Sequence, residues 1–140
     1  MTRPITLLLV SDDPELRAEW QAAEQGLTDI RVLAHFAANA REATRLARAQ
    51  QPDAICLANR TPAADLEALV GELQDAAPAA TYIGLLDRRN FDSGDAETAY
   101  VVTATRLGLR DFLRRPLSSG ELTTCLRRLL QVDQIGRAHV

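Results

Sequence analysis

Polar and charged side chains stand directly after four of the five short apolar runs in this sequence. These segments are Ser-Asp-Asp at 11–13, Asn-Arg at 59–60, Asp87, and Arg-Arg-Pro at 114–116. Carboxylates can hold a divalent cation, whereas arginine guanidinium groups can hold a carboxylate or a phosphate. If the apolar runs are parallel strands, the four segments meet at one edge of a sheet. That edge could then support cation binding, anion binding, or ion pairs between its own side chains.

The rest of the sequence has no other constellation with the spacing of a catalytic or metal site. His35 and His139 have no cysteine, aspartate or second histidine at ligand spacing, and there is no Gly-rich phosphate loop or HExxH motif. The segment 87–95 holds three aspartates and a glycine. It lacks the spacing and the terminal glutamate of a calcium loop, which predicts a solvated surface loop. Cys56 and Cys125 lie in apolar contexts, which favours reduced, buried thiols.

Length and composition are those of one globular domain. The chain has 140 residues, of which 46% are hydrophobic and 25% charged, enough for a single core. A formal net charge of -3 argues against direct binding of nucleic acid. The longest apolar run, 5–10, is too short to cross a bilayer. Because no secretory leader opens the chain, we expect a cytoplasmic protein.

Apolar runs alternate with segments of helical period along the whole chain. Strands are predicted at 5–10, 30–34, 53–58, 82–86 and 111–114. The first predicted helix begins at Pro14, after the N-cap Asp13, and ends at Gly26. Further helices are predicted at 40–50, at 64–76, after the polar loop 87–95 as far as about Leu107, and from Ser118 through Leu130. Alternation of this kind predicts an α/β fold with a parallel, doubly wound sheet. One domain is predicted over 1–131, followed by a linker or tail at 132–140.

Three segments are similar to the response-regulator receiver domain, the CheY-like family. They are Leu-Leu-Val-Ser-Asp-Asp-Pro-Glu-Leu-Arg at 8–17, Pro-Asp-Ala-Ile-Cys-Leu-Ala-Asn-Arg-Thr-Pro at 52–62, and Ala-Thr-Arg-Leu-Gly-Leu-Arg-Asp-Phe-Leu-Arg-Arg-Pro-Leu at 104–117. The resemblance spans roughly 4–131, and its third segment is the most specific. It implies a flavodoxin-like (βα)5 fold with strand order 2-1-3-4-5.

The positions that match the family's phosphorylation site carry other residue types. They are Ser11 and Asp12 for the acidic pair, Ala58 for the phosphoacceptor aspartate, Leu86 for the hydroxyl residue, Arg115 for the lysine, and an unchanged Pro116. Alanine has no nucleophilic atom, and one remaining aspartate is a poor cage for Mg²⁺. We therefore expect a degenerate site without enzymatic activity or cofactor, Mg²⁺ included. A site rebuilt around Asp13 or Asp87 is the less favoured alternative.

The resemblance also suggests roles for residues around this edge. We expect Asp12 and Arg115 to form a structural ion pair in place of the metal. The family's pattern implies a cis peptide bond before Pro116. It places Phe112 at a rotamer-switch position, although a half-buried aromatic is the simpler interpretation. The face made by the fourth helix, the fifth strand and the fifth helix is expected to dock a protein partner or a second copy. Its predicted residues are Tyr100, Val101, Arg106, Phe112 and Leu122.

The function expected from these features is that of a pseudo-receiver, a non-catalytic signalling module that acts by dimerisation or docking. It would form the N-terminal part of a longer protein. The resemblance offers a TadZ/CpaE-type pilus-assembly ATPase or an atypical transcriptional regulator as the parent. Two rivals remain open: a genuine phosphoreceiver of a two-component system that uses a displaced carboxylate, and a small-anion binder that uses Arg60, Arg114 and Arg115.

Overall fold

A computed structural model describes the backbone of residues 3–58 and 63–138, and the side chains of 3–58 and 65–130. Strands and helices alternate along the chain. In order they are β1 (Ile5–Val10), α1 (Pro14–Gln25), β2 (Val32–Ala37), α2 (Ala40–Gln50), β3 (Ala54–Ala58), α3 (Ala63–Ala76), β4 (Thr81–Leu86), the short 3-10 helix η1 (Arg88–Asn90), α4 (Gly94–Leu107), β5 (Leu109–Arg114) and α5 (Ser119–Ala138). The alternation confirms the α/β prediction.

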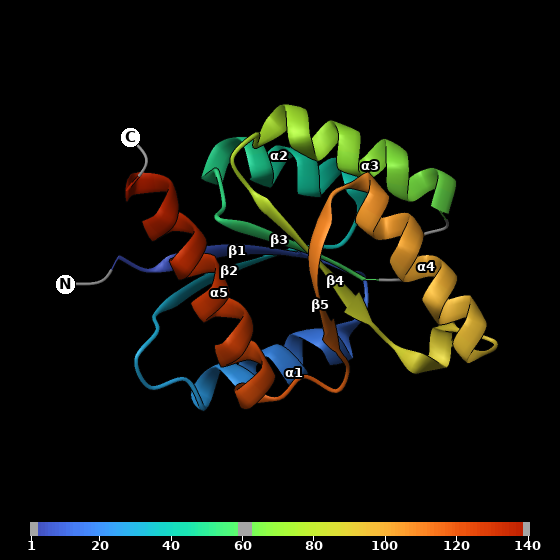
Figure 1. The fold of residues 1–140 in the computed structure, drawn as a ribbon, viewed down its shortest axis with the longest axis horizontal. Helices are drawn as coiled ribbons and strands as arrows, with labels where there is room; N and C mark the ends of the chain where they lie inside the picture. Colours follow the sequence, from blue (N-terminus) through green and yellow to red (C-terminus); the bar gives the residue numbers. More distant parts are fainter. Residues whose placement is uncertain (1–2, 59–62, 139–140) are drawn as a thin grey trace.

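The five strands form one parallel sheet in the order β2-β1-β3-β4-β5. Helices α1 and α5 cover one face of the sheet, and α2, α3 and α4 cover the other (Figure 1). This is the doubly wound, flavodoxin-like arrangement that was predicted. Strand order reverses between β1 and β3, so the carboxyl ends of these two strands border the crevice where such folds bind ligands.

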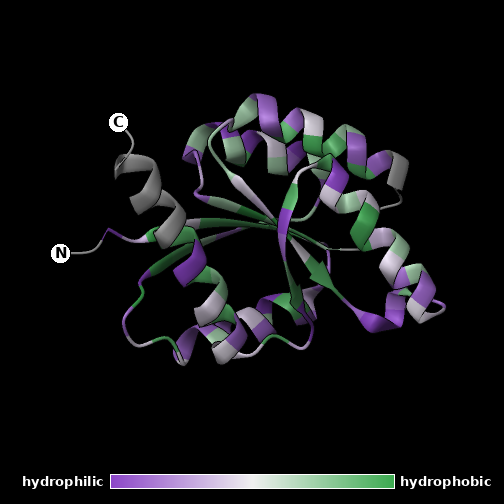
Figure 2. Ribbon diagram, in the orientation of Figure 1, coloured by the Kyte–Doolittle hydropathy of each residue, from purple (hydrophilic) through white to green (hydrophobic). Residues whose placement is uncertain are grey.

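Two apolar clusters fill the spaces between the sheet and its helix layers. One lies under α2, α3 and α4 and includes Ile55 and Leu73, and the other lies under α1 and α5 and includes Trp20 and Leu126. The inner strands are apolar on both faces because both faces are covered, as the green strands at the centre of Figure 2 show. Cys56 and Cys125 are free, buried thiols in the second cluster, as predicted.

Element ends mostly follow the signals in the sequence. The Asp13 side chain caps α1 by accepting a hydrogen bond from the Glu15 backbone N–H at 2.9 Å. Gly108 ends α4 with a φ of +118°, a conformation that favours glycine. The Arg115–Pro116 peptide bond is cis, as the resemblance implied.

Three elements differ from their predicted bounds by two residues or more. Strand β2 occupies Val32–Ala37 rather than 30–34, because its register against β1 pairs Val32 with Ile5 and Ala37 with Val10. Strand β5 begins at Leu109 rather than 111, directly after the Gly108 turn. Helix α5 continues to Ala138, through most of the segment expected to be a linker or tail. Among the described residues, no helix is long and apolar enough to cross a membrane.

Candidate functional site

Three of the polar segments singled out in the sequence, 11–13, Asp87 and 114–116, meet at the carboxyl edge of the sheet. Strands β1, β3, β4 and β5 run parallel and end at Val10, Ala58, Leu86 and Arg114 respectively. The residues that follow β1, β4 and β5 therefore leave the sheet at the same edge. Asn59 and Arg60 lie outside the described residues.

The Arg115 side chain is the centre of this edge. It is only 5% exposed, and its guanidinium group is surrounded by the carboxylates of Asp13 at the start of α1, Glu19 within α1, and Asp87 after β4. One terminal nitrogen donates to Asp13 Oδ2 at 2.9 Å and lies 3.5 Å from Asp87 Oδ2. Its Nε donates to Glu19 Oε1 at 3.3 Å, and its other terminal nitrogen donates to Glu19 Oε2. The guanidinium thus binds Glu19 through two nitrogens and Asp13 through one.

These contacts correct the predicted pair of Asp12 with Arg115. The aspartate that binds Arg115 is Asp13, which also caps α1. One carboxylate oxygen of Asp13 accepts the helix amide and the other accepts the guanidinium. A single side chain therefore fulfils both roles.

Glu19 is a site residue that the sequence analysis missed. Besides Arg115, it accepts the Leu117 backbone N–H at 3.2 Å, so α1 is tied to the chain on both sides of Pro116. A signal was available in the sequence. Glu19 lies three residues after Leu16 and four before Ala23, at the border of the buried stripe of α1. A carboxylate at such a position needs a cationic partner.

Asp87, the residue after β4, is held as firmly as Asp13. It is 7% exposed. Its carboxylate accepts the Arg89 backbone N–H at 3.0 Å and two guanidinium nitrogens of Arg89, at 3.1 and 2.9 Å. Arg89 also lies 3.8 Å from Glu15 of α1. The start of the loop after β4 is therefore fixed in place rather than freely solvated.

The electrostatic environment keeps these groups ionised. The hydrogen bond from Arg115 holds the pKa of Asp13 below its ordinary value, and the hydrogen bond from Arg89 does the same for the pKa of Asp87. Hydrogen bonds to Glu19 and Asp13 raise the pKa of Arg115. Asp13 and Asp87 therefore act as fixed anions beside a permanent guanidinium cation.

A crevice of about 360 Å³ lies beside this network, at the ends of β1 and β3. Its lining includes Ser11, Asp12 and Ala58, together with Asn39 from the start of α2 and Asp65 from α3. The structure thus brings three of the degenerate-site positions together at the expected place. Asp65 is a second carboxylate there that sequence analysis did not single out.

The residues at this edge do not fit the Mg²⁺ site of a phosphoreceiver. Ala58 offers no carboxylate, Asp13 and Asp87 are bound by guanidinium groups, and the buried Leu86 offers no hydroxyl. In the part of the chain that the structure describes, no group of three histidine, cysteine, aspartate or glutamate side chains is arranged to hold a metal ion.

Two of the arginines proposed for anion binding are already engaged. Arg115 lies among its three carboxylates, and Arg114 forms an ion pair with Glu97 of α4, whose side chain is 11% exposed. Arg60 lies outside the described residues. The structure therefore does not bring these arginines together as an anion site.

Four of the five residues predicted for the docking face of α4, β5 and α5 are at least partly exposed. Arg106 is exposed, and Tyr100, Val101 and Phe112 are half-buried. Leu122 is 1% exposed and belongs to the core under α1 and α5, so its assignment to this face is wrong. Among the side chains of this face that the structure describes, the exposed large apolar one is Val102, which is 44% exposed.

Phe112 packs over a glycine in the neighbouring strand. A Cβ atom at Gly84 would lie 2.6 Å from the Phe112 ring, so Gly84 provides the space that the ring occupies. The aromatic is half-buried against the cluster under α2, α3 and α4, which agrees with the simpler of the two interpretations.

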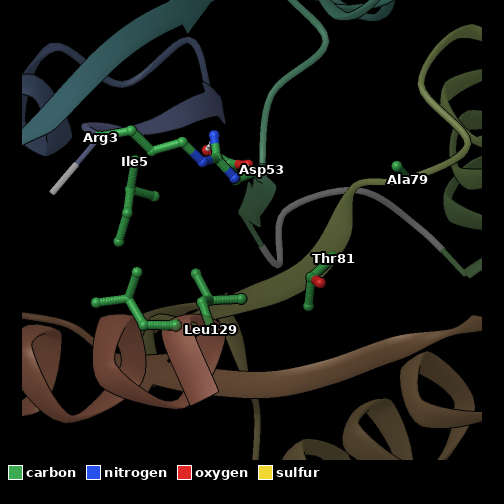
Figure 3. Close-up of a pocket in the computed structure, with 7 residues that line it drawn as sticks. Arg3, Ile5, Asp53, Ala79, Thr81 and Leu129 are labelled. Atoms are coloured by element: carbon green, nitrogen blue, oxygen red, sulfur yellow. Dashed lines mark hydrogen bonds and ion pairs between the residues drawn. The ribbon is translucent and has the colours of Figure 1, made fainter. Parts of the chain in front are cut away.

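A second, smaller cavity of about 120 Å³ lies at the opposite end of the sheet (Figure 3). Arg3 and Asp53 form an ion pair on one side of it, at 2.8 Å, while Ile5 and Leu129 contribute apolar side chains. Asp53 also accepts the Thr6 backbone N–H at 2.8 Å. These polar groups already have partners, and the cavity is remote from the carboxyl edge.

Comparison with known proteins places this architecture among receiver domains. The signal receiver domain of an HD domain-containing protein from Pseudomonas fluorescens Pf-5 has a TM-score of 0.74 and 24% identity, covering 100% of this chain and 96% of that one. A response regulator from Thermotoga maritima has a TM-score of 0.74 and 15% identity, with coverage of 92% and 99%. A protein assigned to pilus assembly (CpaE) from Burkholderia thailandensis E264 has a TM-score of 0.68 and 22% identity, with coverage of 91% and 98%.

No family model matches the sequence, and no curated protein matches it. The similarity to solved structures lies in the fold, which is that of receiver domains.

Proposed function

We propose that this receiver-fold chain is a protein-docking module that works without phosphoryl transfer and is not an enzyme. The observation that carries the proposal is the state of the carboxyl edge. A methyl group stands at Ala58, where a receiver needs a nucleophilic oxygen, and Arg115 occupies the space between the surrounding carboxylates. A metal-dependent switch needs a cation that can bind and leave, whereas the Arg115 guanidinium is a fixed positive charge.

The face of α4, β5 and α5 is the docking surface in this proposal. Strand β5 is an edge of the sheet, so one side of its backbone is unpaired and can accept an added strand or a partner's side chains. Exposed Val102 and half-buried Val101 give the face an apolar centre, and Arg106 and Arg110 give it positive charge. A partner with an apolar patch bordered by carboxylates would complement this surface.

We further propose that the module works inside a longer protein, whose other domains act on the docking event. Receiver-fold chains of similar extent have been solved for an HD domain-containing protein and for a protein assigned to pilus assembly. A pilus-assembly protein or a regulator is the parent that these similarities favour.

Phosphodonor labelling tests the proposal. The chain is incubated with acetyl phosphate and Mg²⁺ beside an active receiver as a positive control, and intact masses are recorded. We expect the control to gain about 80 Da, the mass of one phosphoryl group, while this chain gains none. A stoichiometric adduct on this chain would refute a phosphorylation-independent module.

The rival function is a phosphoreceiver that uses a displaced carboxylate. It is favoured by one observation, which is that Asp12 and Asp65 both line the crevice beside Ala58. If an adduct forms, the variants Asp12→Asn and Asp65→Asn locate it, because only loss of the acceptor oxygen removes the added mass.

A further inference from the structure

Helix α2 presents a row of arginines directly away from the sheet. Arg41, Arg45 and Arg48 are exposed and lie on the side of the helix opposite the buried Ala43 and Ala47. None of the three forms an ion pair within the described residues. Against them the helix carries a single acidic residue. The outer face of α2 is therefore positive.

Helix α3 presents the opposite charge. It contains four acidic residues and no lysine or arginine. The exposed Ala68, Gly71 and Asp75 lie on the side of the helix opposite the buried Leu66, Leu69 and Leu73, and a Cβ atom at Gly71 would meet nothing within 4 Å. Ala68 and Gly71 form a strip of small residues that ends at Asp75, and exposed Glu67 and Glu72 flank it. The outer face of α3 is thus a shallow strip of small residues between carboxylates.

The two faces lie next to each other on one side of the molecule. Helices α2 and α3 are in contact and cover the same face of the sheet (Figure 1). Hydrophilic residues recur along both helices (Figure 2). Although the helices are neighbours, their opposite charges point outward rather than toward each other. Among the described residues, no ion pair joins α2 to α3.

We propose that this face binds a second copy of the chain, with α2 of each copy lying over α3 of the other. A two-fold axis along the groove between the two helices produces this arrangement, and each contact then occurs twice. The arginines of one copy lie over the small strip of the other, where the flanking carboxylates can accept their hydrogen bonds. The face is separate from the α4, β5 and α5 surface, which stays open for another partner.

Charge distribution favours a second copy over a nucleic acid or an anionic membrane. A polyanion attracted to the α2 arginines would also meet the carboxylates of α3 beside them, and the chain as a whole has a net charge of -3. The same face of a second copy carries both charges, so its arginines meet the carboxylates of α3 and its carboxylates meet the arginines of α2.

Sedimentation velocity over a range of concentrations tests the association. We expect a reversible dimer whose dissociation constant rises at least about tenfold when NaCl is raised from about 0.05 M to about 0.5 M, because salt screens exposed charges. A chain that stays monomeric at low salt and high concentration would overturn the inference.

A charge-swap experiment locates the interface. The variant Arg41→Glu/Arg45→Glu/Arg48→Glu makes both helices acidic, and Glu67→Lys/Glu72→Lys/Asp75→Lys makes both basic. Each variant alone is expected to be monomeric, whereas an equimolar mixture should form a heterodimer, because every contact again joins opposite charges. Melting curves of each variant establish that it is folded.

The matched control is Arg106→Glu/Arg110→Glu/Arg127→Glu, which reverses three exposed arginines that are not part of α2 or α3. It should dimerise like the original chain. If this control alone loses the dimer, self-association uses the α4, β5 and α5 face, which overturns the inference and leaves the proposed docking function standing. The inference also fails if the mixture of the two charge-swapped variants stays monomeric. It fails as well if the original chain binds DNA or anionic vesicles and the α2 variant loses that binding.

Discussion

At the scale of single residues, the Arg115 side chain joins parts of the chain that are far apart in sequence. Its planar guanidinium group reaches Asp13 at the start of α1, Glu19 within α1, and Asp87 after β4. A lysine could supply the charge but not the fork of donors that meets several carboxylates at once. The network therefore fixes helix α1 against the carboxyl edge of the sheet.

Removing this guanidinium should be costly. We expect Arg115→Met to lower the free energy of unfolding by about 3 kcal/mol, because it leaves the half-buried carboxylates of Asp13 and Glu19 without their cation. Arg110→Met is the matched control, since Arg110 is exposed on β5, the strand that ends just before Arg115, and forms no ion pair within the described chain. Its effect should stay within about 0.5 kcal/mol. Urea unfolding of both variants gives the comparison, and equal losses would show that the network has no structural role.

The sequence predicted the kind of interaction at Arg115 but not its partners. Ala58, Leu86 and Arg115 lie where strand ends predicted them. The choice between Asp12 and Asp13 depends on how the turn after β1 orients two adjacent side chains, which no periodicity reports. Glu19 could have been found, because it lies beside the apolar stripe of α1.

At the scale of elements, two helix glycines stand at positions with different conformational requirements. Gly108 ends α4 with a φ of +118°, whereas Gly71 lies inside α3 with open space around it. The first position requires glycine and the second does not.

This difference gives a paired prediction. Gly108→Ala should destabilise the fold by about 1 kcal/mol, because the left-handed conformation is strained for alanine. Gly71→Ala should stabilise it by roughly 0.5–1 kcal/mol, because alanine restricts the unfolded chain and favours the helix. Melting temperatures of the two variants should move in opposite directions, and a shift of both in the same direction would contradict this account.

Most elements could be predicted because the spacing of apolar residues along the sequence differs between buried strands and amphipathic helices. The error in β2 has a physical reason, which is that an edge strand tolerates a polar residue such as His35, where the predicted apolar run stopped. The start of β5 was placed late because Arg110 is exposed, although the preceding Leu109 is buried and pairs with Tyr82.

At the scale of the whole molecule, the sheet separates two cores that have different contents. Both thiols lie in the core under α1 and α5, where Cys56 is 1% and Cys125 is 2% exposed. Burial raises the pKa of Cys125 to about 12 and also raises the pKa of Cys56. Neither sulfur is accessible or ionised in the folded protein at neutral pH.

Thiol labelling should therefore report opening of the molecule. We expect both cysteines to resist an aromatic disulfide reagent in buffer and to react together in denaturant, because they share one cluster. Rates measured for Cys56→Ala and Cys125→Ala should agree and should follow the stability seen in urea unfolding. Rapid labelling of either thiol in native buffer would show that this core opens locally.

The occupation of the carboxyl edge by Arg115 has a consequence for anyone who wishes to install a phosphorylation switch in this chain. Aspartate at position 58 would supply a nucleophile, yet Asp13 and Asp87 would still be neutralised and unable to serve a metal. Changing Arg115 first would release Asp13 but would weaken the fold, and Asp87 would still be held by Arg89. Neither substitution helps alone, so a redesign has to introduce both at once, preferably in a background that has been stabilised beforehand.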